Sequence, residues 1–141
     1  MSTETAWFAG LFDGEGYIAL HRRGGVRKDG QRSIRLMVSV SNTEKSLVEP
    51  FLIIFGGRIE NIRGYQENHK PYFRWTLFNA EALRFLNRID PCLRSTKKKK
   101  GVGLAREFRT LVGSQGSRTT PEQRAEREAL WTRMKQINKR G

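Results

Sequence analysis

Residues 8–16, which read Phe-Ala-Gly-Leu-Phe-Asp-Gly-Glu-Gly, constrain the fold of this chain more than any other segment. Apolar side chains recur at helical spacing over residues 7–12, and this spacing predicts an apolar helix face. Gly14 and Gly16 are expected to end the helix, because glycine adopts the backbone angles that lead a chain out of a helix. Strand-like alternation begins directly after Gly16. The segment therefore predicts a helix over residues 3–13 that leads at once into a strand.

Two acidic residues, Asp13 and Glu15, fall at the end of this predicted helix. The helix dipole disfavours negative charge at a C-terminus, and no basic residue lies beside them in the sequence. A bound cation would stabilise both carboxylates, so the pattern indicates a cation site. The alternative is a polar turn that leads into a hairpin, since Asp-Gly pairs are common in turns.

The charge of the chain indicates the kind of partner it binds. The 141 residues carry a net charge of +13, from 27 Lys and Arg against 14 Asp and Glu. Such an excess indicates a polyanion, either a nucleic acid or an anionic membrane. No apolar segment is long enough to span a membrane, and the N-terminus lacks a secretion signal. We therefore expect nucleic acid as the partner, no membrane, and an intracellular location in the cytoplasm or nucleoid of a prokaryote or in an organelle matrix.

The cysteine and histidine content excludes several classes of site. Cys92 is the only cysteine, and His21 and His69 are the only histidines. A disulfide within one chain, a cysteine-based zinc site and a histidine-rich nuclease centre are therefore excluded. Cys92 is expected to be a buried structural thiol.

Helices and strands are expected to alternate along the chain. The strands are predicted over residues 17–23, 32–41, 58–64 and 72–78, and the helices over residues 3–13, 44–55, 80–89, 98–112 and 121–138. Thr43, Asn79 and Thr120 are expected to cap the second, third and last helices. Loops are expected at residues 24–30 and 68–71.

The chain is predicted to divide after residue 112. Residues 1–112 would form the core domain, because this length is enough for one hydrophobic core. Residues 113–117 are rich in Gly and Ser, a composition typical of a flexible linker. Residues 113–141 would then form a linker and a basic C-terminal helical extension. This extension docks on the core or along DNA, or is a partly disordered appendage.

The order helix, hairpin, helix, hairpin, helix is typical of an α+β fold in which helices cover one face of a small antiparallel sheet. The uncovered face would carry long donors and short hydroxyls that can reach phosphates and base edges. The candidate DNA-binding residues on this face are Tyr17, His21, Arg23, Arg35, Ser39, Ser41, Tyr72, Arg74 and Thr76. Any one of them, taken alone, is also compatible with an ordinary solvent-facing strand position.

Residues 8–16 resemble the signature of the LAGLIDADG homing endonuclease family. Ala9, Gly10, Asp13 and Gly16 are identical to it, the other helical positions keep apolar character, and Glu15 replaces one acid with another. The resemblance extends over about residues 5–112 through the order of elements. It implies an αββαββα core with a saddle-shaped antiparallel sheet that reads the major groove, helices on the other face, and additional C-terminal helices.

The resemblance also implies an activity and an assembly. The activity is the Mg²⁺-dependent hydrolysis of both strands of a long double-stranded DNA site; Mn²⁺ is expected to substitute, and Ca²⁺ to support binding. Because the chain contains one copy of the motif, the resemblance implies a homodimer on a pseudo-palindromic target. The residues expected at the dimer interface are Ala6, Ala9, Gly10 and Asp13.

Three catalytic residues follow from the resemblance. Glu15 would bind the metal, and the backbone carbonyl of Gly14 would be a further ligand. Asn42 would orient water near the metal, although an Asx turn before the second helix explains it equally well. Lys97 would face the active site, with Lys98 as the second choice and as a DNA contact.

Two other functions use the same scaffold. One is a maturase, for which intron RNA would be the ligand, and the other is a DNA-binding regulator that does not cleave. Glu15 favours the enzyme, because a carboxylate beside an anionic backbone is costly unless a cation compensates it. A maturase could retain the same acid.

Overall fold

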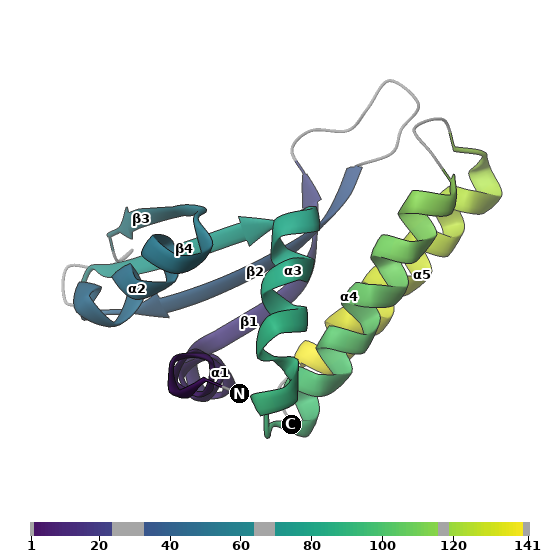
Figure 1. The fold of residues 1–141 in the computed structure, drawn as a ribbon. Coiled ribbons are helices and arrows are strands. Elements are labelled where there is room, and N and C mark those ends of the chain that lie inside the picture. Colours follow the sequence, from purple (N-terminus) through teal and green to yellow (C-terminus); the bar gives the residue numbers. More distant parts are fainter. Residues whose placement is uncertain (1, 24–32, 64–69, 116–118, 140–141) are drawn as a thin grey trace.

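The structure is a computed structural model that describes residues 2–23, 33–63, 70–115 and 119–139. Along the chain lie α1 (Thr3–Glu15), β1 (Gly16–Arg23), β2 (Ser33–Asn42), α2 (Lys45–Phe55), β3 (Arg58–Ile62), β4 (Tyr72–Phe78), α3 (Asn79–Ile89), a 3₁₀ turn (Asp90–Cys92), α4 (Thr96–Gln115) and α5 (Pro121–Asn138) (Figure 1). The predicted order of elements is therefore confirmed. The expected loop at residues 24–30 and residues 68–69 of the second loop lie outside the described part of the chain.

The four strands form one antiparallel sheet in the order β1-β2-β4-β3. Side chains alternate across it, so one face is apolar and lies under the helices (Figure 1). The buried residues of this face are Ile18, Leu20, Leu36, Val38, Val40, Trp75 and Leu77. The other face has no helix on it among the described elements. The expected α+β architecture, with helices on one sheet face, is confirmed.

Aromatic side chains from the first three helices form the centre of the core. Phe51 lies 4.8 Å from Phe8 and 4.9 Å from Trp75 between ring centroids, and Phe85 lies 5.0 Å from Trp75. The Trp75 indole donates a 2.7 Å hydrogen bond to the Gly56 carbonyl. This bond satisfies the polar atom of a fully buried side chain, and the aromatic packing fixes α1, α2 and α3 on the sheet.

Helix α1 is longer than predicted, and Gly16 follows it for a different reason. The helix includes Gly14 and Glu15, and Gly16 has an extended backbone (φ −83°, ψ 158°) that any residue adopts. A Cβ on Gly16 would instead overlap the ring and carbonyl oxygen of Phe12. Glycine is therefore required here by close packing and not by backbone angles, which corrects the expectation from the sequence.

Two of the predicted caps are wrong. Helix α2 begins at Lys45, and Asn42, not Thr43, makes the local contact, since its Oδ1 accepts the Glu44 N–H at 2.8 Å. Asn79 is already inside α3 with φ 51°, and its Oδ1 accepts the Leu36 N–H at 3.1 Å. Asn79 therefore ties the end of β4 to β2. Thr120 does cap α5, through a reciprocal capping box with Gln123.

The C-terminal helix packs on the core, which was one of the alternatives expected for residues 113–141. Helix α4 continues through residues 113–115, where a linker was expected, and α5 buries Leu130 and Met134 in the common core. Arg22 on β1 forms an ion pair with Glu128, and its guanidinium lies 3.7 Å from the centroid of the Trp131 ring. Contacts of this kind join α5 to the β1 edge of the sheet (Figure 1).

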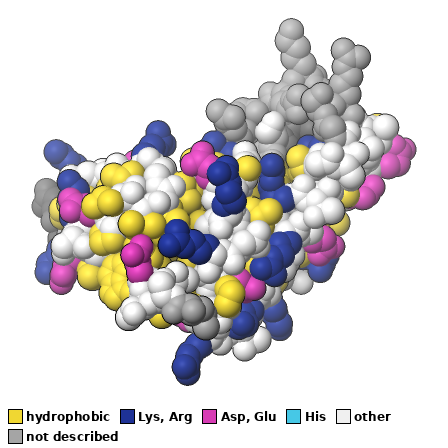
Figure 2. Space-filling model, viewed as in Figure 1, with side chains coloured by type: hydrophobic (Ala, Val, Ile, Leu, Met, Phe, Trp, Pro, Cys, Tyr) yellow, Lys and Arg dark blue, Asp and Glu magenta, His cyan; other side chains and the backbone are white. Residues whose placement is uncertain are grey.

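The helix-covered face carries both charged and apolar side chains (Figure 2). Apolar side chains gather over α2, where Ile53 is 76% exposed. Cys92 is half-buried against the core, which it was expected to enter fully. Within the described residues, every helix is too short or too polar to cross a membrane.

We expect Gly16→Ala to lower the free energy of unfolding by about 1–3 kcal/mol, because the new methyl group overlaps Phe12. The matched control is Gly103→Ala in the exposed part of α4, where a Cβ meets nothing within 4 Å. That change should raise stability by about 0.5–1 kcal/mol, because alanine is the better helix former. Urea denaturation of both variants measures the difference. Equal stabilities would contradict the packing role of Gly16.

Candidate functional site

The two acids of the sequence motif have different environments at the end of α1. Asp13 Oδ2 accepts the Arg94 N–H at 2.9 Å, and its Oδ1 accepts the Ser95 N–H at 3.1 Å. These donors precede the first turn of α4, where the helix dipole is positive. Asp13 is therefore compensated within its own chain, by backbone donors that are distant in the sequence.

Glu15 remains the uncompensated acid of the motif. It is exposed in the last turn of α1, and its carboxylate makes no hydrogen bond or ion pair to the described part of the chain. The carbonyl of Gly14 lies in the same final turn, where carbonyl groups have no partner within a helix. Two oxygen donors thus lie together at the negative end of the α1 dipole.

The α4 helix separates the run of four lysines onto different faces. Lys97 and Lys100 share a face with Leu104, by their helical spacing, and line a cleft toward α5. Burial lowers the pKa of Lys98, the neighbouring Lys97 lowers it further, and Asp13 partly opposes both by raising it. Lys98 is therefore the lysine within electrostatic reach of the motif. Lys97 instead donates a long hydrogen bond to the Asn138 carbonyl, at 3.4 Å.

Asn42 lies at the end of β2 and is partly committed to the backbone. Its Oδ1 holds the Glu44 N–H, which is the Asx turn that the sequence left as one alternative. A role in orienting water could use its amide nitrogen or the second lone pair of this oxygen.

The uncovered sheet face is strongly basic. His21 pairs in register with Arg35, and Ser41 with Arg74. Burial lowers the pKa of His21, and the charges of Arg35 and Arg74 lower it further. The Arg35 guanidinium stacks 3.6 Å from the centroid of the Phe78 ring, which holds its donors in a fixed orientation.

Register brings one residue of each strand into a single row across this face. The row runs Tyr17, Ser39, Thr76 and Arg58. Tyr17 is 46% exposed, whereas Ser39 and Thr76 are only 4% and 5% exposed. The two hydroxyl residues therefore form the floor of the face and offer little surface to DNA, which corrects their assignment as direct contacts.

Other candidates on the face are placed as follows. Ser41 and Tyr72 are half-buried, and Arg23 lies at the end of β1 with its side chain outside the described part. Arg58 was missed by the sequence reasoning, and it is exposed and paired with Glu60 at 3.0 Å. Glu60 is the only acid on this face among the described strand residues. The alternation of Arg58 with Ile59 was a signal, but only the register with Thr76 assigns Arg58 to this face.

The outer side of α1 is flat and built from small residues. Ala6 is exposed, and a Cβ on Gly10 or Gly14 would meet nothing within 4 Å. A second helix could approach closely along this side. Ala9 is 0% exposed, buried in its own core, so it presents no surface to a partner. Asp13 is hydrogen-bonded to the start of α4. Of the residues predicted at the dimer interface, Ala6 and Gly10 therefore remain accessible to a partner helix.

Comparison with known proteins gives structural matches only. No family model and no curated protein matches the chain. The homing endonuclease I-CvuI, in complex with its target in the presence of Ca, superposes with a TM-score of 0.76 at 14% identity, over 98% of this chain and 83% of that chain. The archaeal intron-encoded homing endonuclease I-Vdi141I, complexed with DNA, has a TM-score of 0.76 at 16% identity, over 98% and 86%. The LAGLIDADG homing endonuclease I-GzeII, in complex with a DNA target, has a TM-score of 0.72 at 18% identity, over 94% of this chain and 45% of that chain.

The chain has the LAGLIDADG endonuclease fold. The fold predicted from the sequence motif is thereby confirmed. The chain spans most of I-CvuI and I-Vdi141I but less than half of I-GzeII.

The oxygen donors at the end of α1 fit a hard divalent cation of the kind that this fold implies. Mg²⁺ prefers oxygen ligands and is commonly held by one or two carboxylates together with substrate phosphates. Glu15 and the Gly14 carbonyl match this donor chemistry. Among the described residues no group of three His, Cys, Asp or Glu side chains could hold a metal by itself. A cation at Glu15 would therefore need ligands besides the His, Cys, Asp and Glu side chains of the described residues.

We expect Asp13→Ala to lower the free energy of unfolding by about 1–2 kcal/mol, because it leaves the Arg94 and Ser95 N–H groups without their acceptor. The loss should be accompanied by faster amide hydrogen exchange in the first turn of α4. Glu81→Ala, at an exposed acid in the first turn of α3, is the control and should cost only a few tenths of a kcal/mol. Unchanged exchange in α4 would contradict the capping role of Asp13.

Proposed function

We propose that this chain is a homing endonuclease of the single-motif LAGLIDADG type, which binds a long pseudo-palindromic DNA site as a homodimer and hydrolyses both strands with a divalent metal. The observation that carries the proposal is the exposed carboxylate of Glu15, which has no compensating group in the described chain and directly precedes β1 of the sheet with the basic face. An acid in that position opposes DNA binding unless a cation is bound with it. A protein that only binds DNA would gain from a neutral or basic residue there.

The uncovered face supplies the surface for the duplex. Arg35, Arg74 and Arg58 project donors from three neighbouring strands, and arginine pairs with guanine edges and with phosphates. A sheet of this kind can enter the major groove of B-DNA. The solved structures that share the fold support this use of the face, because they are DNA complexes.

Two copies of the chain are needed to form the proposed nuclease. The small outer side of α1 ends at Glu15, so pairing two α1 helices about a twofold axis brings two such carboxylates near that axis. Each copy would read one half-site. The match to I-GzeII supports a two-copy arrangement, because this chain covers only 45% of that longer protein.

The residues around Glu15 have separate roles in the proposed cleavage. Bound Mg²⁺ would lower the pKa of a water molecule and stabilise the charge on the leaving oxygen. Glu15 and the Gly14 carbonyl would hold the cation, and the Asn42 amide nitrogen would donate toward water. Lys98, next to Asp13, adds positive charge to the side of the scissile phosphate. Lys97, the first choice from the sequence, lines the cleft beside α5 and donates a hydrogen bond to the Asn138 carbonyl.

We expect Glu15→Gln to reduce DNA cleavage by at least about 100-fold, because the amide no longer neutralises the cation. Selective binding should persist or tighten, since one negative charge is removed from beside the phosphates. The target is first selected from randomised duplex DNA in Ca²⁺ and then tested for cleavage in Mg²⁺. Glu4→Gln, an exposed acid at the other end of the same helix, is the control and should cleave normally.

The outcomes of that selection separate the three functions. Cleavage of both strands by the wild type but not by Glu15→Gln supports the endonuclease, and cleavage that survives the substitution overturns the role of Glu15. Selective binding with no cleavage in Mg²⁺ or Mn²⁺ indicates a regulator. Failure to select any duplex makes intron RNA the next ligand to test.

We expect two protein chains on each complete DNA site, and we expect Gly10→Leu to weaken this assembly at least about 10-fold. A leucine side chain would separate the paired α1 helices, because Gly10 has open space around it within its own chain. Gly103→Leu makes the same change at an exposed glycine of α4 and is the control. Mass photometry with duplex DNA measures the stoichiometry. A single chain that cuts both strands of a complete site would exclude the homodimer.

A further inference from the structure

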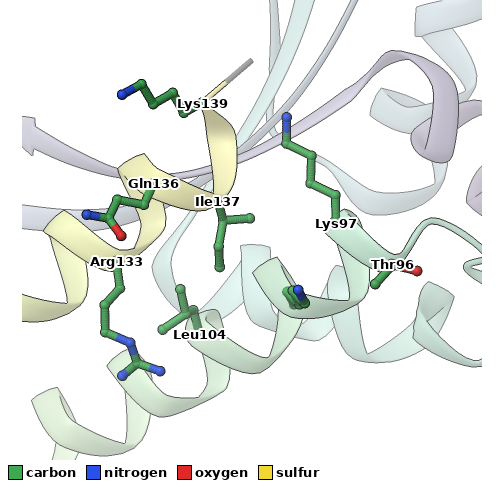
Figure 3. Close-up of a pocket in the computed structure, with 8 residues that line it drawn as sticks. Thr96, Lys97, Leu104, Arg133, Gln136, Ile137 and Lys139 are labelled. Atoms are coloured by element: carbon green, nitrogen blue, oxygen red, sulfur yellow. The ribbon is translucent and has the colours of Figure 1, made fainter. Parts of the chain in front are cut away.

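A cleft of about 870 Å³ opens between the first turns of α4 and the last turns of α5 (Figure 3). Its floor is apolar, where Leu104 and Ile137 point toward one another from the two helices. Its walls carry four cations, Lys97, Lys100, Arg133 and Lys139, and none of the described residues that line it is acidic. The sequence motif and the proposed active site do not account for this concentration of charge.

The cations of the cleft are only partly compensated by the protein. Arg133 is paired with Glu107 at 3.0 Å, outside the lining. Lys97 donates a hydrogen bond of 3.4 Å to the Asn138 carbonyl at the end of α5, where the helix dipole favours a cation. Lys100 forms no ion pair with the described part of the chain. Like charges held in one concave site repel one another, and a bound anion would relieve that repulsion.

The cleft adjoins the edge of the sheet and lies near the motif. The Asn138 side chain donates a 2.8 Å hydrogen bond to the Ile18 carbonyl on β1, and Gly101 packs on the Ile18 side chain. Tyr17, the residue before Ile18 on β1, lies on the uncovered face of the sheet, which is the side proposed to face DNA. The helix end that carries Glu15 directly precedes this strand.

This position suits the backbone of DNA. A sheet inserted in the major groove lies between two phosphate strands about 12 Å apart, while strands within a sheet are about 4.8 Å apart. A four-stranded sheet therefore fills the groove, and the groups beside its outer strands meet phosphates. The β1 edge is the outer edge that the α4–α5 cleft borders.

We infer that the cleft between α4 and α5 is a phosphate site that holds the DNA backbone passing the β1 edge, next to the cleavage centre. Lys100 and Lys139 bind phosphate oxygens there, and Lys97 closes the cleft on the side of α1. The site contributes affinity and register and does not read base sequence. This inference rests on the proposed function, since it assigns the same DNA a second point of attachment.

The test is the salt dependence of DNA binding by Lys100→Gln/Lys139→Gln. Each lost phosphate contact reduces the slope of log K against log salt concentration by about 0.9, so we expect a reduction of about 1.8 per protein chain. Affinity should fall by a similar factor for the selected site and for random duplex. Phosphate ethylation interference should disappear at two adjoining backbone positions in each half-site and persist at the others.

The matched control is Lys99→Gln/Lys135→Gln, which removes the same charge from the same two helices. Lys99 and Lys135 are exposed and do not line the cleft. Their substitution should leave the interference pattern intact and change the slope by less than about half as much. Urea denaturation of both variants separates binding from a structural role of the lysines at the end of α5.

The comparison of the cleft variant with the control variant decides between the outcomes. A larger loss of slope for the cleft variant than for the control, with local loss of ethylation interference, supports the phosphate site. Equal slopes for the two variants overturn it, as does a loss confined to stability, and neither result affects the proposed endonuclease. Failure of the wild type to bind any duplex overturns both proposals together.

Discussion

The contact between Asp13 and the start of α4 is the interaction on which the candidate site depends. One carboxylate receives the N–H groups of Arg94 and Ser95, so the C-terminal end of α1 and the N-terminal end of α4 are joined directly. Opposite ends of two helix dipoles meet there, with the negative charge of Asp13 facing the positive end. Lys98 in the first turns of α4 interacts electrostatically with the same Asp13, two residues before Glu15.

Charge is distributed unevenly over this small fold. Several acids have a basic partner, as Glu60, Glu107 and Glu128 do with arginines. Glu15 differs, because no described residue compensates it. The uncovered sheet face gathers Arg35, Arg74 and His21, where burial and then the two arginine charges lower the pKa of the histidine. A polyanion and a cation bound together would resolve both imbalances, which is the physical basis of the proposed nuclease function.

The C-terminal helix connects this electrostatic arrangement to the stability of the fold. Its capping box starts it cleanly at Pro121, its apolar residues Leu130 and Met134 enter the common core, and Asn138 ends it on the backbone of β1. Because α5 is fixed along its whole length, the cations at its end have defined positions beside the sheet. A flexible extension would have spread the same charges over many positions and formed no cleft.

The sequence alone determined the elements of this protein, their order and the faces of its strands, because helix and strand periodicity are local properties. The motif of residues 8–16 also indicated the fold. Only the tertiary structure decided that Asp13 is capped by α4, that Ala9 is buried, that Asn79 reaches β2, and that Lys97 lines a cleft beside α5. Each of these depends on residues distant along the chain and on the register or rotation at which two elements meet. Local periodicity does not contain that information, because the packing of side chains between elements fixes it.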